Sequence, residues 1–341
     1  MNWLVLLLKK LNVIPAPLLD VYPAMCGARG LLEANRLGVF QALSKSPQGL
    51  NTGELAGQTG LSEEGAGILL EALCQLGYLR CRRGQYANGP WVKRWILSPE
   101  SGLSNFLRLQ GHLWTRLTDL EVPLRTGKPV LDYHQVETAL PSEKQEIYTE
   151  AMREMARLLI PSFLKHVEIS PKAQTVLDLG GAHGEYTRAL SRRYPRLRGT
   201  IFDLPGPLAS ARRIFEQKGN PEEIQLREGD ILKDDLGEGW DVILVINTLH
   251  LFSLGQNQEL FKRIQKALSP GGAVVVLDQF LGAGRIPDVV AAIISLAFFT
   301  VGGRVYGLQE TRRLLRNSGF SRVRTRPFRL RAPAALLEGW K

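Results

Sequence analysis

The residues of this sequence best suited to chemistry lie in the segment Val176–Glu185, which reads VLDLGGAHGE. An apolar strand at 175–179 is predicted to lead into this glycine-rich turn, and a helix pattern follows the turn. Gly180, Gly181 and Gly184 carry no Cβ, so the backbone can turn sharply there and approach a ligand closely. A strand–loop–helix of this kind predicts a binding site for a nucleotide-like cofactor.

The spacing of this loop, Asp178-x-Gly180-x-Ala182-x-Gly184, favours one kind of cofactor. A dinucleotide-binding loop reads Gly-x-Gly-x-x-Gly and brings a helix N-terminus onto a pyrophosphate. An acid two residues before the first glycine instead suits a cationic cofactor, and S-adenosylmethionine carries both an ammonium and a sulfonium group. Since a glycine-rich loop alone is weak evidence, the acids further along the chain must decide.

Two further acids follow the next two predicted strands. Asp203, 25 residues after Asp178, ends the second strand, where an acid takes the ribose hydroxyls of a nucleoside. Asp230 and Ile231 end the third strand, where a carboxylate and an apolar side chain can hold and cover an adenine. A plain turn role is the alternative for Asp203 and for Asp230. Three acids after three successive strands are more specific than any one of them.

The elements that must position these acids alternate between strand and helix. We predict strands at 176–179, 200–202, 224–228, 241–246, 273–278, 321–326 and 334–339, and helices at 186–193, 207–218, 257–268, 289–301 and 308–318. This alternation predicts an α/β fold with a doubly wound, mainly parallel sheet and helices on both faces. Such sheets bind ligands outside the carboxyl ends of their strands, where the three acids would meet.

The first part of the chain follows a mainly helical pattern. We predict three helices and a β-hairpin, which together make a winged helix, at 30–43, 54–59, 63–76 and 78–86. Thr52 and Ser62 are predicted to cap the second and third helices, and Gly77 to end the third. Residues 101–165 are predicted to be mostly helical, and 166–175 to be a linker.

At this point the sequence resembles the S-adenosylmethionine-dependent methyltransferases. More narrowly, it resembles the small-molecule O-methyltransferases of the plant caffeate, animal acetylserotonin and bacterial antibiotic-tailoring types. The resemblance covers nearly the whole chain, and beyond the acids and glycines it is carried by GVFQAL at 38–43, ELA at 54–56, LLEAL at 69–73 and IYTEAM at 147–152. It implies a homodimer with three segments: a winged-helix dimerisation domain, a helical connector that feeds the acceptor pocket, and a Rossmann-like methyltransferase domain, at 1–100, 101–170 and 171–341.

The resemblance implies S-adenosyl-L-methionine as the cofactor. It assigns cofactor binding to residues at the ends of the predicted strands, namely Asp178, Gly180, Gly181, Gly184, Asp203, Leu204, Asp230, Ile231 and Asn247. Ala182 stands where the family usually has a third glycine, a small change that the loop should tolerate. No His/Asp/Glu cluster has metal-ligand spacing, so we expect a metal-independent enzyme.

The resemblance also implies a catalytic base at His250, which follows the fourth predicted strand. An imidazole with a pKa near 6.5 is a suitable base for a phenol with a pKa of about 10. The family often has Asp and Trp after this histidine, where Leu251 and Phe252 stand here, so a packing or substrate-orienting histidine is the alternative. Glu310 matches a family glutamate that can brace the histidine, or is a helix N-terminal acid. For Asp278 we expect a turn role.

Several aromatic and methionine side chains could line a flat apolar pocket for the acceptor, although core packing is the first interpretation for any one of them. As a set they lie where the family builds its acceptor site: Phe106, Trp114, Tyr133, Tyr148, Met152, Met155, Phe298 and Phe299. We therefore expect an aromatic or polycyclic acceptor. His183 lies within the glycine-rich loop, where its backbone is expected to matter more than its ring.

The composition bounds the class of protein. The 341 residues are 44% apolar and 22% charged, as in ordinary globular proteins. Three cysteines without a Cys-x-x-Cys pair indicate a reducing compartment, and we expect a cytoplasmic protein. No apolar run approaches the roughly 20 residues that span a bilayer. Met1–Lys10 is predicted to be a first helix that packs on a partner surface, with a shallow membrane contact as the alternative.

The formal net charge is +10, and nine arginines with the single acid Glu310 lie between Arg304 and Arg331. A solvated basic face is the first interpretation; attraction to an anionic substrate, an acidic carrier protein or a membrane surface are the others. DNA binding is disfavoured, because the third helix, 63–76, has three glutamates and no Lys or Arg.

Two alternatives to O-methylation remain. The first is a C- or N-methyltransferase of the same fold, for example on a tetrapyrrole, without a histidine base. The second is a dimerisation or scaffold protein with a vestigial site.

Overall fold

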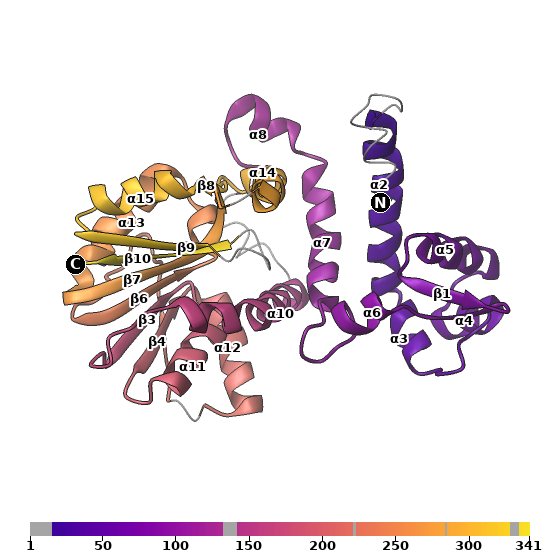
Figure 1. The fold of residues 1–341 in the computed structure, drawn as a ribbon, viewed down its shortest axis with the longest axis horizontal. Coiled ribbons are helices and arrows are strands. Elements are labelled where there is room, and N and C mark those ends of the chain that lie inside the picture. Colours follow the sequence, from indigo (N-terminus) through magenta and orange to yellow (C-terminus); the bar gives the residue numbers. More distant parts are fainter. Residues whose placement is uncertain (1–15, 132–141, 221–222, 284, 328–333) are drawn as a thin grey trace. The chain divides into compact units, whose positions relative to one another are not determined.

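The computed structural model describes residues 16–131, 142–220, 223–283, 285–327 and 334–341. These fall into two compact units, residues 1–111 and 112–341 (Figure 1). The predicted N-terminal helix at 1–10 and the pocket candidate Tyr133 lie outside the described residues. The division of the chain into three segments stays a prediction.

The first unit contains the expected helices and hairpin. Its elements are α2 (Ala16–Arg36), α3 (Val39–Ser44), α4 (Thr52–Thr59), α5 (Glu63–Gln75), β1 (Leu79–Arg82), β2 (Gln85–Asn88), α6 (Pro90–Trp95) and the first part of α7 (Ser104–Leu117). The antiparallel hairpin β1–β2 pairs Leu79 with Asn88 and Arg82 with Gln85. The apolar faces of α3, α5 and β1 share one buried core.

Two local predictions in this unit are wrong. The single helix expected at 30–43 is broken at Gly38, whose φ of 77° lies in the left-handed region that an α-helix does not pass through. Thr52 does not cap α4; Asn51 does, since its Oδ1 accepts the N–H of Glu54 at 2.9 Å and Glu54 accepts the N–H of Asn51 at 2.8 Å. The cap at Ser62 is confirmed, because its Oγ accepts the N–H of Gly65.

The second unit holds the predicted alternation of strands and helices. Its helices are the rest of α7, α8 (Glu121–Thr126), α10 (Ser142–His166), α11 (Glu185–Arg193), α12 (Pro205–Lys218), the short 3₁₀ helix η1 (Leu249–Leu251), α13 (Leu254–Ala267), α14 (Arg285–Phe299) and α15 (Leu308–Asn317). Its strands are β3 (Thr175–Leu179), β4 (Arg198–Asp203), β5 (Gln225–Glu228), β6 (Trp240–Ile246), β7 (Leu268–Leu281), β8 (Tyr306–Gly307), β9 (Arg322–Pro327) and β10 (Ala334–Trp340).

The strands form one sheet in the order β5-β4-β3-β6-β7-β10-β9, with β8 on the end of β7. Strands β3 to β7 pair in parallel, and β10 runs antiparallel between β7 and β9. The predicted doubly wound, mainly parallel sheet is confirmed. Along the sheet the chain order reverses between β3 and β6, and ligands bind at such a switch point.

Side-chain alternation along the strands separates two cores. Leu177, Ile243 and Val274 face the side covered by α13 and α15, whereas Val176 and Leu244 face α10 and α11 (Figure 1). The segment 166–175 is not a linker between the two units, because Ile169 and Ala173 are buried in the second of these cores.

Candidate active site

The loop that follows β3, residues 178–184, is called the cofactor loop here. At its start, Asp178 is 2% exposed, and its Oδ2 accepts the Thr187 hydroxyl at 2.5 Å. Its Oδ1 is enclosed and has no hydrogen-bond partner among the described residues. Burial raises the pKa of Asp178 to about 7. This acid therefore has one carboxyl oxygen that the rest of the protein does not use.

At two positions of this loop, neighbouring atoms lie so close to the backbone that only glycine fits. A Cβ added at Gly181 would lie 2.6 Å from Cγ of Asp178, and one at Gly184 would lie 2.6 Å from Cδ1 of Ile201. Ala182 adopts a φ of 38°, a left-handed conformation that is strained for any residue but glycine. The loop accommodates this alanine, as expected, but in a strained conformation that a glycine would adopt without strain.

Asp203 closes the loop against β4. Its Oδ2 accepts the N–H of Ala182 at 2.9 Å, and its Oδ1 accepts the N–H of Leu204 at 2.8 Å. Burial raises the pKa of Asp203 to about 6. Each carboxylate oxygen has a second lone pair, so Asp203 can hold the loop and still accept bonds from a ligand.

The third acid has a more local environment. Asp230 accepts the N–H of Leu232 at 2.9 Å, and Nζ of Lys233 lies 3.1 Å from its other oxygen. Ile231 is 3% exposed and packs in the core on the α13 side. Binding of an adenine by Asp230 and Ile231 stays a prediction.

The ring of His183 has a structural role that the sequence did not indicate. Its Nδ1 accepts the N–H of Glu185 at 3.1 Å and so caps the start of α11. Burial lowers the pKa of His183 to about 4, which keeps the ring neutral. Arg153 of α10, also buried, binds Glu185 through its Nε at 3.0 Å and Glu150 at 2.5 Å. Helix α10, which carries Tyr148 and Met152, is thereby tied to the end of the cofactor loop.

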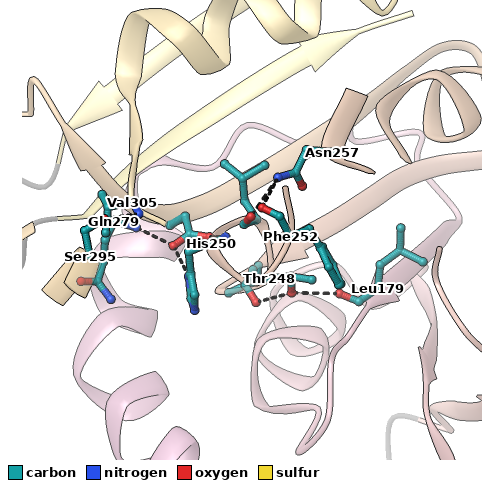
Figure 2. Close-up of polar contacts among 11 residues, drawn as sticks. Leu179, Thr248, His250, Phe252, Asn257, Gln279, Ser295 and Val305 are labelled. Atoms are coloured by element: carbon teal, nitrogen blue, oxygen red, sulfur yellow. Dashed lines mark hydrogen bonds and ion pairs between the residues drawn. The ribbon is translucent and has the colours of Figure 1, made fainter. Parts of the chain in front are cut away.

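The segment that follows β6 packs directly against the cofactor loop. Asn247 has a φ of 52°, and its N–H donates to the carbonyl of Leu277. The Thr248 hydroxyl donates to the carbonyl of Ile246 at 3.0 Å and to that of Leu179 at 3.4 Å (Figure 2). Strained residues such as Asn247 concentrate at functional sites. The two segments therefore meet at the switch point of the sheet.

His250 lies on the turn 248–252, called the base turn here. Its Nδ1 lies 2.6 Å from Oδ1 of Asp278, and its backbone N–H donates to Oδ2 of Asp278 at 3.3 Å. The turn role expected for Asp278 is wrong: this fully buried acid lies within β7, three residues before the end of the strand, and binds the histidine. The ring atom Nε2 has no hydrogen-bond partner among the described residues.

The base turn is held from several sides. The His250 ring stacks on Phe298 with 3.9 Å between the ring centroids, and a Cβ added at Gly303 would lie 1.8 Å from the His250 carbonyl oxygen. Nδ2 of the fully buried Asn257 donates to the carbonyls of Leu249 and Phe252, at 3.0 and 3.3 Å (Figure 2). The Tyr306 hydroxyl also donates to the carbonyl of Phe252, at 2.5 Å.

The sequence alone did not identify Asp278, Asn257 and Tyr306 as partners of this turn. For Asp278 a signal existed, since an acid near the carboxyl end of a strand next to β6 must lie near the turn that follows β6. The signal for Asn257 is its place in the first turn of α13, close behind the base turn.

The other predicted site residues have, in the described part of the chain, no hydrogen bond, ion pair or ring contact with His250 that would support their predicted roles. Glu310 accepts from Arg304 at 2.6 Å and from the N–H of Gly307 at 3.2 Å, which corresponds to the alternative of a helix N-terminal acid. It is Asp278, not Glu310, that binds the His250 ring. Phe106 belongs to the first unit and Trp114 to the second.

No group of three or more His, Cys, Asp or Glu side chains that could hold a metal ion occurs in the described part of the chain. Among the same residues, no helix is long and apolar enough to cross a membrane.

The parallel sheet, the acids at its edge and the histidine beyond it are typical of an α/β protein that binds a nucleoside cofactor. Comparison with known proteins identifies the family. Residues 126–321 match the O-methyltransferase domain, and residues 29–98 match the O-methyltransferase dimerisation domain. The chain belongs to the O-methyltransferase family. Its cofactor is therefore S-adenosylmethionine, and the dimerisation domain supports a homodimer.

Relatives extend over most of the chain. The tetracenomycin polyketide synthesis 8-O-methyl transferase TcmO of Streptomyces glaucescens is 31% identical over 334 residues, which cover 91% of this chain and 93% of that protein. Acetylserotonin O-methyltransferase of Mus musculus is 29% identical, with 91% and 84% covered. The crystal structure of human N-acetylserotonin methyltransferase with SAM shares the fold, with a TM-score of 0.82 at 22% identity and coverage of 96% and 97%.

The residues at the carboxyl edge fit this cofactor. The unpartnered oxygen of Asp178 suits an ammonium group. The space beside Asp178 is so narrow that residue 181 must be glycine, because any side chain there would collide with the carboxyl group. Two neighbouring buried acids whose pKa values are raised by burial are typical of a functional site.

Proposed function

We propose that this protein methylates a hydroxyl group of a small aromatic or polycyclic acceptor, with His250 as the general base. The observation that carries the proposal is the pairing of His250 with the buried Asp278, which leaves Nε2 as the unoccupied ring atom. A carboxylate on Nδ1 keeps the proton there, so the unprotonated Nε2 can accept the hydroxyl proton. Asp278 then balances the charge of the imidazolium that forms.

The cofactor, when bound, supplies a methyl group on a sulfonium, which leaves as a neutral thioether. The chain must bind that cation, align the acceptor and take its proton. We assign the cofactor's ammonium group to Asp178, its ribose hydroxyls to Asp203 and its adenine to Asp230. The enclosed oxygen of Asp178 supports the first assignment, and the position of Asp203 at the end of β4 supports the second.

The acceptor class rests on the stacking of Phe298 against His250 and on the relatives. An aromatic face beside the base favours a flat acceptor. TcmO is named for a polyketide, and another relative, 27% identical, is the 3-hydroxy-5-methyl-1-naphthoate 3-O-methyltransferase of Streptomyces sahachiroi. We assign Tyr148 and Met152 of α10 to the wall of the acceptor pocket.

The test is a screen of hydroxylated aromatic compounds with methyl-labelled S-adenosylmethionine, repeated with His250→Ala. We expect O-methyl products, and a loss of kcat of about 10²–10⁴-fold in the variant, with unchanged affinity for S-adenosylhomocysteine. Unchanged turnover in the variant would instead indicate a carbon acceptor or an oxygen that is already ionised.

A further inference from the structure

Helix α10 is held in place differently along its length. Its C-terminal half packs in the apolar core beside the sheet, through Ala156, Leu159 and Phe163. Among the described residues of this helix, none before Ala156 belongs to that core, and Tyr148 and Met152 lie in this earlier part, one turn apart. The part of α10 that we assign to the acceptor pocket therefore depends on other contacts for its position.

Arg153, next to Met152 in the chain, provides such a contact. It is 3% exposed, and a charge buried to this extent needs charged partners. Its guanidinium has two: Nη1 lies 2.5 Å from Oε1 of Glu150 in the same helix, and Nη2 and Nε lie 2.9 and 3.0 Å from Oε1 of Glu185. Because a buried charge that loses a partner is left uncompensated, we expect these three side chains to move as a unit.

Glu185 connects this cluster to the cofactor loop. It is the first residue of α11 and directly follows Gly184, the last residue of the loop. Its backbone N–H donates to Nδ1 of His183 within the loop at 3.1 Å, while its carboxylate binds Arg153 of α10. A ligand that holds the loop in one conformation therefore also holds the Glu185 carboxylate, and through it Arg153.

We propose that Arg153 is a positioning residue that transmits cofactor binding to the first half of α10, so that Tyr148 and Met152 are in place before the acceptor binds. An acceptor that meets an already ordered wall loses less conformational entropy on binding, so the two ligands should bind cooperatively. By linkage, the acceptor should tighten cofactor binding by the same factor. The inference rests on the proposed function for the assignment of Tyr148 and Met152 to the acceptor pocket.

Hydrogen–deuterium exchange of the full-length protein tests this inference with S-adenosylhomocysteine alone. Exchange of the α10 amides between residues 147 and 155 is compared with and without a saturating concentration of this ligand. We expect the ligand to slow exchange there about tenfold in the native protein, because local opening of the helix becomes less favourable. In Arg153→Met the slowing should fall below about twofold, while the amides of the cofactor loop stay protected.

A purely structural role of Arg153 would give a different result. Exchange in α10 would then accelerate equally with and without the ligand, and the native ratio would persist. If Arg153→Met does not fold, Glu185→Gln serves instead, since it removes the charge on the loop side and leaves Arg153 paired with Glu150. A native ratio in either variant, or a native protein whose α10 does not respond to the ligand, would overturn the inference.

The matched control is Arg213→Met. Arg213 of α12 also pairs with a glutamate of α10, Glu146, at 3.9 Å, but the two side chains are 48% and 62% exposed. Such a surface pair contributes little, and neither residue belongs to the cofactor loop. This variant should keep the native ratio. An equal loss of the ratio in this control would contradict a specific role of Arg153.

The screen with methyl-labelled S-adenosylmethionine separates this result from the fate of the proposed function. O-methyl products from a protein whose α10 does not respond to S-adenosylhomocysteine would contradict only the role of Arg153. A response of α10 that depends on Arg153, in a protein that forms no O-methyl product, would support the coupling and contradict the proposed function.

Discussion

The cofactor loop and the base turn lie on either side of the switch point, yet they treat their polar groups in opposite ways. In the cofactor loop, Asp178 keeps an oxygen without a partner, and burial raises its pKa. In the base turn, Asp278 pairs with Nδ1 of His250, and Asn257 and Tyr306 bind the backbone carbonyls from within the protein. We propose that a charge from outside completes the first region, whereas the second is held in place by contacts within the protein.

The largest effect on catalysis is expected in the base turn. Asp278→Asn leaves an uncharged amide on Nδ1 of His250, which neither fixes the same tautomer nor balances the imidazolium. We expect kcat to fall by about 10²–10⁴-fold, as for loss of general-base catalysis, with unchanged affinity for S-adenosylhomocysteine. Steady-state kinetics and calorimetry measure the two quantities.

Asp241→Asn is the control for this change. Asp241 lies at the opposite end of β6, where its Oδ2 accepts the N–H of Gln174 at 2.7 Å. Substitution there should leave kcat within about twofold of the native value. If Asp278→Asn is as active as this control, the base turn is not preorganised by the carboxylate.

At the other end the effect should appear in binding. Asp178→Asn removes the charge opposite the cofactor's ammonium group, and a hydrogen bond to a charged group contributes about 1.5–3 kcal/mol. We expect affinity for S-adenosylhomocysteine to fall about 10–100-fold, with little change in kcat at saturating cofactor. A variant that binds the cofactor product as tightly as the native protein would show that Asp178 does not contact the cation.

The raised pKa values predict the pH dependence of the same step. Asp178, with a pKa of about 7, must lose its proton to bind a cation, so affinity should fall about tenfold from pH 8 to pH 6. Binding at pH 7 should release protons, which calorimetry in two buffers of different ionisation enthalpy detects. Affinity that is constant over this range would contradict the raised pKa.

The stability of the cofactor-free protein should change with pH in the opposite direction to its affinity for the cofactor product. Because the folded state holds the Asp178 proton more tightly than the unfolded chain, this group contributes less to stability as the pH rises from about 4 to 7. Asp178→Asn should therefore raise the melting temperature of the free protein at pH 8, in contrast to its effect on binding.

The smallest expected effect concerns the strain in the cofactor loop. Ala182→Gly relieves a left-handed φ worth about 1–2 kcal/mol and adds chain entropy worth about 0.5–1 kcal/mol to the unfolded state. We expect a net gain of about 0.5 kcal/mol in the free energy of unfolding, measured by denaturant titration. A loss of more than about 1 kcal/mol would show that the alanine methyl packs usefully.

Much of the fold could be predicted from the sequence, because each strand is short, apolar and bounded by turn residues. The predicted strand at 241–246 and helix at 308–318 differ from β6 and α15 by one residue at one end. The break at Gly38 was missed since the apolar pattern continues across it. The cap at Asn51 was missed because Asn and Thr are both good caps, and only the backbone geometry chooses between them.

The site was harder to predict where it depends on register. The pairing of His250 with Asp278 follows from the parallel alignment of Ile246 with Leu277, which no local pattern reveals. Glu310 was expected to brace the histidine through a resemblance, but in the structure it caps its own helix and binds Arg304. The acids and glycines of the cofactor loop needed no such information, since strand ends alone bring them to one edge.

Helix α14 and the segment after it contact His250 at two points: Phe298 covers the face of the imidazole, and Gly303, just beyond the helix, lies against the His250 carbonyl. We therefore expect a ligand that displaces this helix to displace His250, the proposed base, as well. An acceptor of the wrong shape would be penalised twice, once in how tightly it is held and again in how fast it reacts. Attempts to broaden the range of acceptors by enlarging side chains or cavities along α14 should accordingly change turnover together with selectivity.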